Sequence, residues 1–211
     1  MWRAALCQLV QTMPNREEDE MVKGEGGKLV LILGGARSGK SRLAEEMALA
    51  SGGKTVYLAT AAIHDEEMAH RVALHKKRRP SDWLTLEEQW DLPGALEKVS
   101  PETETVVVDC LTLWLTNLLL PHYSAEATFV ELESVENEIS KALHSLCLKT
   151  KERLFTTILV ANEVGCGIVP ESPLGRFFRD LAGRANQLVA KEADEVYFAV
   201  AGYLLRVKGE A

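Results

Sequence analysis

The sequence lacks several features that would place it in common classes of protein. Its four cysteines include no C-x-x-C pair, which argues against a zinc site or a disulfide framework and fits a reducing compartment. The longest apolar stretch in the middle of the chain, 111–120, is too short to span a bilayer and contains three polar residues. We therefore expect a cytoplasmic protein that does not span a membrane.

An excess of positive charge is also lacking. The chain has 24 basic and 31 acidic residues and a formal net charge of −7, which argues against nonspecific binding of nucleic acid. With 211 residues, 46% of them hydrophobic, it is long enough for one domain with a substantial core. There are no internal repeats and no low-complexity tract. No nucleic-acid partner is expected.

The first 27 residues differ in composition from the rest. They begin with a short apolar stub that has one basic residue, too little for a secretory signal, and continue into a charged stretch and a glycine-rich linker. We expect 1–27 to be a disordered leader and 28–211 to form a single domain. The alternative is that the leader forms a short helix that covers a neighbouring surface.

The most informative motif is the octet GGARSGKS at 34–41, which follows an apolar run and precedes a strongly helix-forming segment. It matches the phosphate-loop pattern G-x-x-x-x-G-K-[ST]. Glycines let successive backbone N–H groups turn towards a phosphate, and the following helix adds the positive end of its dipole. Lys40 is expected to bridge the β- and γ-phosphates of a nucleoside triphosphate, and the Ser41 hydroxyl to ligate Mg²⁺. The expected phosphate-binding residues are Gly34, Gly35, Ala36, Arg37, Ser38, Gly39, Lys40 and Ser41.

A second element of such a site is a carboxylate at the end of a buried strand. The run TVVVD at 105–109 is apolar and ends in Asp109, which we expect to hold Mg²⁺ directly or through water. Alone this pattern is weak, because many strands end in an aspartate that caps a turn. Beside a phosphate loop, it predicts a second metal-linked group.

Strand-like and helical patterns alternate along the chain, which predicts an α/β fold with a mostly parallel sheet. The expected strands are 28–33, 54–59, 84–87, 105–110, 156–161, 195–201 and 203–207. The expected helices are 41–51, 64–78, 91–99, 111–120, 126–149 and 172–191. Ligands of such sheets bind beyond the carboxyl ends of the strands, so chemistry is expected from the loops that follow them.

The helix expected at 64–78 ends in a cluster of cations around His75. Like charges disfavour the cationic form of a histidine, so His75 could stay neutral and attack phosphorus. The alternative is a solvated basic helix end, where cations interact favourably with the helix dipole. His70 lies well round the helix and is expected at the surface. Glu163 follows the strand expected at 156–161 and is expected at the crevice. The arginines of the helix expected at 172–191 either reach an anionic substrate or are solvated: Arg176, Arg179 and Arg184.

Taken together, these motifs resemble one enzyme family. They are GGARSGKSR at 34–42, YLATA at 57–61, H-x-x-RRP-x-x-W-x-T-x-E at 75–87, DCLT-x-W at 109–114, TNL at 116–118, NEVG-x-GIVP at 162–170 and FRD-x-AGR-x-NQ at 178–187. In this order they resemble the bifunctional adenosylcobinamide kinase/adenosylcobinamide-phosphate guanylyltransferases of cobalamin synthesis. The resemblance runs from about residue 28 to 208. It implies a RecA-like P-loop NTPase fold with helices on both faces of the sheet, and a homotrimer.

The resemblance also implies two activities and their substrates. ATP or GTP phosphorylates adenosylcobinamide, and GTP then transfers GMP to a histidine and onward to adenosylcobinamide phosphate, giving adenosyl-GDP-cobinamide. The family's GMP-accepting histidine falls on His75, because it is the histidine that precedes x-x-Arg-Arg-Pro. Further nucleotide contacts of the family fall on Ala59, Thr60, Ala61, Lys76, Lys77, Arg78, Arg79, Glu87 and Asp109.

Two other classes of function compete with this interpretation. A plain small-molecule kinase would keep the phosphate loop and Asp109 but would not need His75. A non-enzymatic GTP-dependent switch or metallochaperone would normally carry an Asn-Lys-x-Asp motif that reads guanine, and the sequence has none. Covalent GMP on the protein would separate the bifunctional enzyme from both.

Overall fold

The computed structural model describes residues 26–62, 66, 70, 72–73, 76–77, 79–124 and 126–209. All but the last two residues of the expected leader 1–27 lie outside this range, as does most of the helix expected at 64–78. His75 and Arg78 are among the residues outside it.

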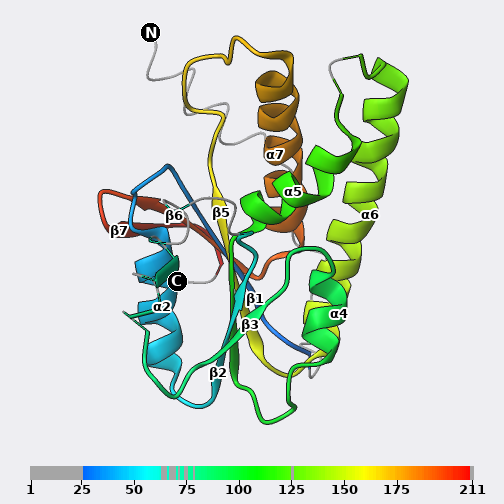
Figure 1. The fold of residues 1–211 in the computed structure, drawn as a ribbon. Coiled ribbons are helices and arrows are strands. Elements are labelled where there is room, and N and C mark those ends of the chain that lie inside the picture. The colour runs from blue at the N-terminus through cyan, green and yellow to red at the C-terminus, as the bar shows by residue number, and fades with distance from the viewer. Residues whose placement is uncertain are drawn as a thin grey trace, which may run out of the picture.

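The described residues form a seven-stranded sheet with the strand order β3-β2-β4-β5-β1-β6-β7 (Figure 1). All neighbouring strands are parallel except β6 and β7, which form an antiparallel hairpin at one edge. The strands are β1 (Leu29–Gly34), β2 (Thr55–Ala59), β3 (Leu84–Glu87), β4 (Thr105–Asp109), β5 (Thr156–Asn162), β6 (Glu195–Val200) and β7 (Tyr203–Lys208).

Helices cover both faces of this sheet, as Figure 1 shows. One face packs against α2, and the other packs against α4, α6 and α7. The helices are α2 (Lys40–Ser51), α4 (Leu92–Glu97), α5 (Leu111–Leu119), α6 (Phe129–Glu152) and α7 (Pro173–Glu192), with a 3-10 turn, η1 (Leu120–His122), after α5. The α/β fold with a mostly parallel sheet between helices is therefore confirmed.

The central strands are apolar because both of their faces are covered. Side chains of β1 alternate between two cores: Leu29 and Leu31 face the helices α4 to α7, whereas Val30 and Ile32 face α2. Cores on both sides hold the sheet rigidly, so the loops at its carboxyl edge start from fixed positions.

The helix α6 begins and ends three residues later than expected. The helix was expected at 126–149 but begins after Thr128, whose hydroxyl accepts a hydrogen bond from the backbone of Glu131 while the Glu131 carboxylate accepts one from Thr128. This reciprocal capping box satisfies donors that would otherwise be unpaired at the start of the helix, and so fixes where it begins. At the other end, α6 continues to Glu152.

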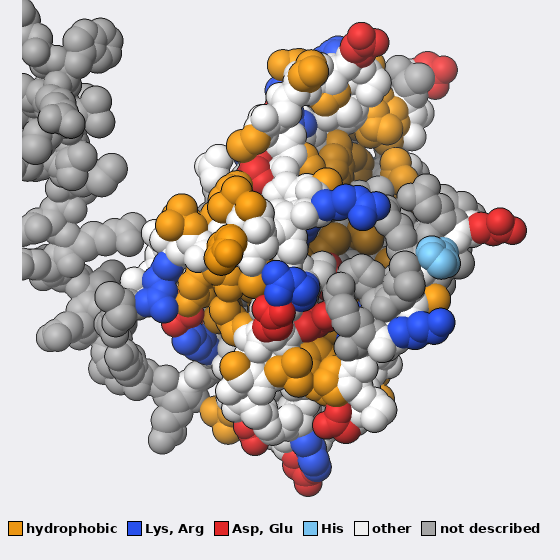
Figure 2. Space-filling view, turned by 90° about the vertical axis from the view of Figure 1, so that its left-hand side faces the viewer, with side chains coloured by type: hydrophobic (Ala, Val, Ile, Leu, Met, Phe, Trp, Pro, Cys, Tyr) orange, Lys and Arg blue, Asp and Glu red, His pale blue; other side chains and the backbone are white. Residues whose placement is uncertain are grey.

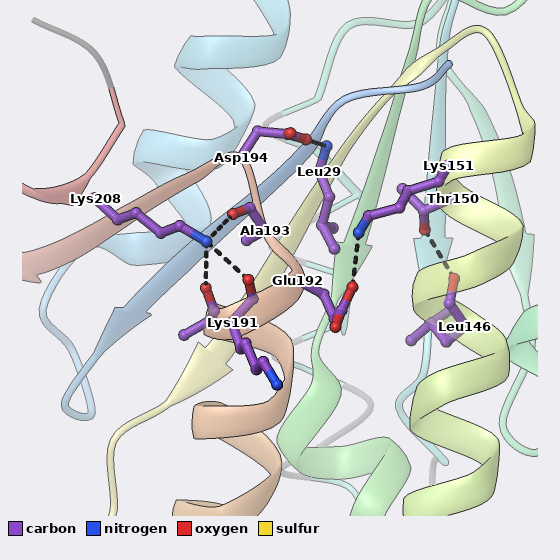
Figure 3. Close-up of polar contacts among 10 residues, drawn as sticks. Leu29, Leu146, Thr150, Lys151, Lys191, Glu192, Ala193, Asp194 and Lys208 are labelled. Carbon is purple, nitrogen blue, oxygen red and sulfur yellow. Dashed lines mark hydrogen bonds and ion pairs between the residues drawn. The ribbon is translucent and has the colours of Figure 1, made fainter. Parts of the chain in front are cut away.

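Polar contacts fasten the amino end of the sheet, opposite the phosphate loop (Figure 3). The backbone N–H of Leu29 donates to the Asp194 carboxylate (2.7 Å), and Lys151 pairs with Glu192 (2.6 Å). From β7, the Lys208 ammonium donates to the last carbonyls of α7 and to Ala193, at 2.5–3.0 Å. A cation at this position satisfies carbonyls that the helix leaves unpaired and interacts favourably with the helix dipole.

Within the described part of the chain, no helix combines the length and apolarity needed to cross a membrane.

The burial of β1 predicts a large stability effect for one core substitution. Leu31 is 0% exposed, so Leu31→Ala should lower the free energy of unfolding by about 2–5 kcal/mol, through lost burial and a residual cavity. Leu148→Ala is the matched control, because Leu148 on α6 is 60% exposed and its loss should change stability by under about 0.5 kcal/mol. Denaturant titration of both variants at one protein concentration measures the difference. Equal effects would contradict the described core.

Candidate active site

The phosphate loop connects β1 to α2 at the carboxyl edge of the sheet. Its backbone takes conformations that favour glycine, with φ of 56° at Arg37 and 94° at Gly39. Gly34 is required for a different reason, since a Cβ there would lie 2.6 Å from the carbonyl oxygen of Ala199 on β6. The close approach of β6 therefore fixes where the loop begins. The loop then closes with the backbone N–H of Ser38 donating to Gly35 (3.2 Å).

The turn between β6 and β7 braces this loop from outside. The backbone N–H of Gly202 donates to the carbonyl of Ser38 (2.9 Å), and the Arg42 guanidinium donates to the carbonyl of Gly202 (3.2 Å). A Cβ at Gly39 would lie 3.3 Å from the Cα of Gly202, so the two backbones nearly touch. The sequence predicted the hairpin but gave no sign that its turn supports the phosphate loop.

Lys40 begins α2 and points into the loop. Its side chain is largely buried, and the ammonium donates to the carbonyl of Gly35 (3.1 Å). Burial lowers its pKa, and the nearby Asp109 carboxylate acts in the opposite direction. An ammonium that donates to a carbonyl of the loop is placed to exchange this carbonyl for a phosphate oxygen.

Asp109 ends β4, two strands away from the phosphate loop in the sheet. Its Oδ2 accepts a hydrogen bond from the buried Tyr57 hydroxyl (2.6 Å). Burial of Tyr57 and the charge of Asp109 both raise the pKa of this hydroxyl above its usual range, so it stays protonated and donates. Tyr57 begins one of the family motifs, but the sequence did not predict its contact with Asp109, because a tyrosine in an apolar strand is typical of a core residue.

The donor groups at this edge suit Mg²⁺ carried by a nucleotide. Ser41 and Asp109 offer oxygen atoms, which Mg²⁺ prefers, and phosphate oxygens and water usually complete its octahedron. The described residues contain no cluster of three or more acidic, histidine or cysteine side chains that could hold a metal ion without such a partner. The residues present therefore fit a metal that arrives with its triphosphate.

Thr60, in the loop after β2, is committed to the protein itself. Its hydroxyl accepts from the backbone N–H of Cys110 (2.7 Å) and donates to the carbonyl of Cys110 (2.8 Å), which a cis peptide bond joins to Asp109. The Asn117 amide donates to the carbonyls of Thr60 (3.0 Å) and Gln89 (3.1 Å). The fully buried Thr60 thus ties the loops after β2, β3 and β4 together, whereas its neighbours Ala59 and Ala61 are only partly buried.

The basic segment expected near the nucleotide is divided by the fold. Lys76 is exposed and pairs with Glu87 at the end of β3 (2.8 Å), and Lys77 is exposed beside it. The Arg79 side chain is instead only 6% exposed, with its guanidinium 3.3 Å from the centroid of the Tyr57 ring. The structure thus brings Arg79 towards Asp109 from inside the protein.

The loop after β5 lies against the phosphate loop. The backbone N–H of Glu163 donates to the carbonyl of Gly34 (3.0 Å), so Glu163 lies at the carboxyl edge of the sheet, beside the start of the phosphate loop. The arginines of α7 have protein partners: Arg176 donates to the carbonyl of Pro170 (3.1 Å), while Arg179 pairs with Asp180 (2.9 Å) and Arg184 with Glu136 of α6. Their expected alternative role, to hold an anionic substrate, would require exchange of these contacts.

The position of Lys40 predicts its effect on nucleotide binding. Lys40→Ala should weaken GTP binding by about 2 kcal/mol, or roughly thirtyfold, because it removes a charged donor to the β- and γ-phosphates. Lys54→Ala is the control, since Lys54 precedes β2 at the opposite edge and pairs with Glu102 in solvent. Isothermal titration with a nonhydrolysable GTP analogue compares the two variants. Unchanged affinity of Lys40→Ala would remove the phosphate-binding assignment.

Comparison with known proteins finds similar sequences and a similar solved structure. The chain is similar to the bifunctional adenosylcobalamin biosynthesis protein CobP of Pseudomonas aeruginosa, with 44% identity over 180 residues that cover 85% of this chain and 97% of that protein. It is also similar to CobU of Escherichia coli, with 38% identity over 181 residues that cover 85% and 99%. Among solved structures, it is similar to the RadB recombinase, with a TM-score of 0.45, 20% identity, and coverage of 82% of this chain and 74% of that chain.

A family model extends over nearly the whole described domain. The model for cobinamide kinase / cobinamide phosphate guanyltransferase matches residues 30–207, from β1 through β7. The match includes the phosphate loop, Asp109 and the loop after β5. The chain therefore belongs to the cobinamide kinase / cobinamide phosphate guanyltransferase family.

Proposed function

We propose that the protein phosphorylates adenosylcobinamide and then transfers GMP from GTP to adenosylcobinamide phosphate, giving adenosyl-GDP-cobinamide. The observation that carries this proposal is that Lys40 points into the phosphate loop at the same edge of the sheet at which β4 ends in Asp109. The chain also matches the family model over residues 30–207. ATP and GTP are the proposed nucleotide substrates.

The first activity needs the γ-phosphoryl group of a triphosphate to be held against a substrate hydroxyl. The loop 34–41 would surround the β-phosphate with backbone N–H groups, and Lys40 would contact the β- and γ-oxygens. Ser41 and Asp109 would hold Mg²⁺, which when bound neutralises charge on the phosphates. The protein thereby contributes orientation and preorganised charge, which lower the barrier without a covalent step.

The second activity includes a covalent step on His75, which lies outside the described residues. A neutral imidazole nitrogen would form a bond to the α-phosphorus of GTP as the bond to the β-phosphate breaks, releasing pyrophosphate. A phosphate oxygen of the cobinamide substrate would then attack the same phosphorus and free the imidazole. Both transfers would use one nucleotide-binding crevice, with contacts at Ala59–Ala61, Lys76–Arg79 and Glu87.

Two cations that neighbour His75 in the sequence have acidic partners in the structure. Lys76 pairs with Glu87 (2.8 Å), and Nε of Arg79 lies 3.9 Å from Oε1 of Glu45. A contact of either cation with a nucleotide would require exchange of these partners.

We also propose that the protein is a cytoplasmic homotrimer. An apolar face of the hairpin supports assembly. Tyr203, Leu205 and Val207 lie on the same face of β7, and Val200 of β6 pairs with Tyr203 on that face. All four side chains are more than half exposed. Figure 2, which views the side of the molecule where β6 and β7 lie, shows hydrophobic side chains gathered there.

The covalent step predicts a specific protein adduct. Protein mixed with labelled GTP and Mg²⁺ should acquire GMP through a phosphoramidate bond that survives alkali and is lost in acid. His75→Ala should abolish the label, whereas the exposed His70 serves as control and His70→Ala should retain it. Label that persists on His75→Ala would disprove this nucleophile. Phosphorylation of cobinamide by wild type without any adduct would instead favour a plain kinase.

The assembly proposal predicts a change in mass in solution. Leu205→Asp places a charge in the apolar face, so it should convert the trimer to a smaller species, measured by light scattering after gel filtration. Leu148→Asp, equally exposed but on α6, should leave the mass unchanged. A trimer that persists in Leu205→Asp would place the interface elsewhere.

A further inference from the structure

Asp109, the proposed metal-linked carboxylate, is joined to a group of buried polar side chains. Together with Asp109 they are Glu45 of α2, Tyr57 of β2 and Arg79, and we call this group the Tyr57 cluster. Two of its members, Glu45 and Tyr57, are absent from the nucleotide contacts that the family resemblance implies. Tyr57 is 2% exposed, and the side chains of Glu45 and Arg79 are each 6% exposed.

The sheet places the Tyr57 hydroxyl at Asp109. β2 and β4 are parallel neighbours, with Tyr57 opposite Val107 and Ala59 opposite Asp109. Tyr57 and Asp109 therefore lie on the same face of the sheet, one step apart along it. The phenol ring spans this step, and its hydroxyl donates to Oδ2 of Asp109 at 2.6 Å. No described residue donates a hydrogen bond to Oδ1, the other carboxylate oxygen.

Arg79 packs over one face of the Tyr57 ring. The guanidinium carbon lies 3.3 Å from the ring centroid, a cation–π contact. The same guanidinium donates to the Thr85 hydroxyl of β3 (3.3 Å), and its Nε lies 3.9 Å from Oε1 of Glu45. Tyr57 and Thr85 are themselves opposite each other in the sheet. The ring therefore cannot turn away from Asp109 without disrupting the contacts of Arg79.

A purely structural role does not account for the hydroxyl. Phenylalanine would fill the same core space without a polar atom, and burying a hydroxyl costs free energy unless it forms a hydrogen bond. Here the hydrogen bond goes to Asp109, a carboxylate whose charge acts on Lys40 of the phosphate loop. Partners of this kind orient metal ligands, and their loss typically weakens metal binding about 10- to 100-fold.

We propose that Tyr57 is a positioning residue, which holds Oδ2 of Asp109 and so directs Oδ1 towards the divalent cation of a bound triphosphate. Arg79 and Glu45 fix the ring that carries this hydroxyl. The inference rests on the proposed nucleotide site, and it adds a role for Tyr57 and Glu45, two buried residues that are not among the proposed nucleotide contacts.

The experiment compares two tyrosines in similar surroundings. Tyr197 of β6 is also buried, donates to a carboxylate (Glu195, 2.8 Å) and has an arginine over its ring (Arg206, 5.5 Å), but it lies away from Asp109. Tyr57→Phe and Tyr197→Phe therefore remove the same kind of hydrogen bond. Free Mn²⁺ is measured by electron paramagnetic resonance with a nonhydrolysable GTP analogue, and affinity for the analogue alone is measured without metal.

Tyr57→Phe should raise the Kd of Mn²⁺ in the nucleotide complex about tenfold and leave metal-free nucleotide affinity within about twofold. Tyr197→Phe should change neither value. In an Asp109→Ala background, Tyr57→Phe should have no further effect on Mn²⁺, because the hydroxyl acts through that carboxylate. Glu45→Gln, which removes the charge beside Arg79, should give a smaller shift in the same direction and provides the test if Tyr57→Phe does not fold.

An unchanged Kd of Mn²⁺ in folded Tyr57→Phe would overturn the inference and leave the proposed function intact. An equal loss of metal-free nucleotide affinity would also overturn it, since a structural defect would act on both. Failure of the wild-type protein to bind Mn²⁺ with the analogue would overturn the proposed nucleotide site itself, and the inference with it.

Discussion

The close approach of β1 to β6 at Gly34 is the constraint on which the site depends. Gly34 is paired with Asn162 on one side and Ala199 on the other, and no Cβ fits between them. The phosphate loop therefore leaves the sheet at a fixed point, and α2 starts with Lys40 directed back into the loop. The turn at Gly202 then supports the loop from outside. Any shift of β6 would move the phosphate-binding groups with it.

A second set of contacts places the remaining groups relative to that loop. Thr60 and Asn117 join the loops that follow β2, β3 and β4, so Asp109 is held in a framework shared by three strands. Tyr57 and Arg79 hold the same region from within the core. The site is thus built from two rigid parts, the phosphate loop on β1 and the carboxylate on β4, joined through the sheet. Such preorganisation suits phosphoryl and nucleotidyl transfer, where orientation and charge supply much of the catalysis.

The sequence predicted the strands well because buried parallel strands are continuous apolar runs between polar loops. It also predicted the phosphate loop and Asp109, whose residue types are dictated by phosphate and metal chemistry. It predicted the start of α6 less well, because the pattern of apolar residues did not reveal the Thr128 capping box. The roles of Tyr57, Arg79 and Gly202 could not be predicted, since they arise from contacts between segments far apart in the chain. Arg79 in particular belongs to a basic stretch that is typical of a solvated surface, yet its side chain is buried.

The central claim is that one crevice serves both phosphorylation and guanylylation. Equilibrium dialysis with nonhydrolysable analogues of ATP and GTP, labelled differently, tests it most directly because it counts the nucleotides bound to each chain. We predict a single bound nucleotide per chain at saturation, with full mutual competition between the two analogues. Simultaneous binding of both analogues to one chain, without competition, would show two separate sites and contradict the account.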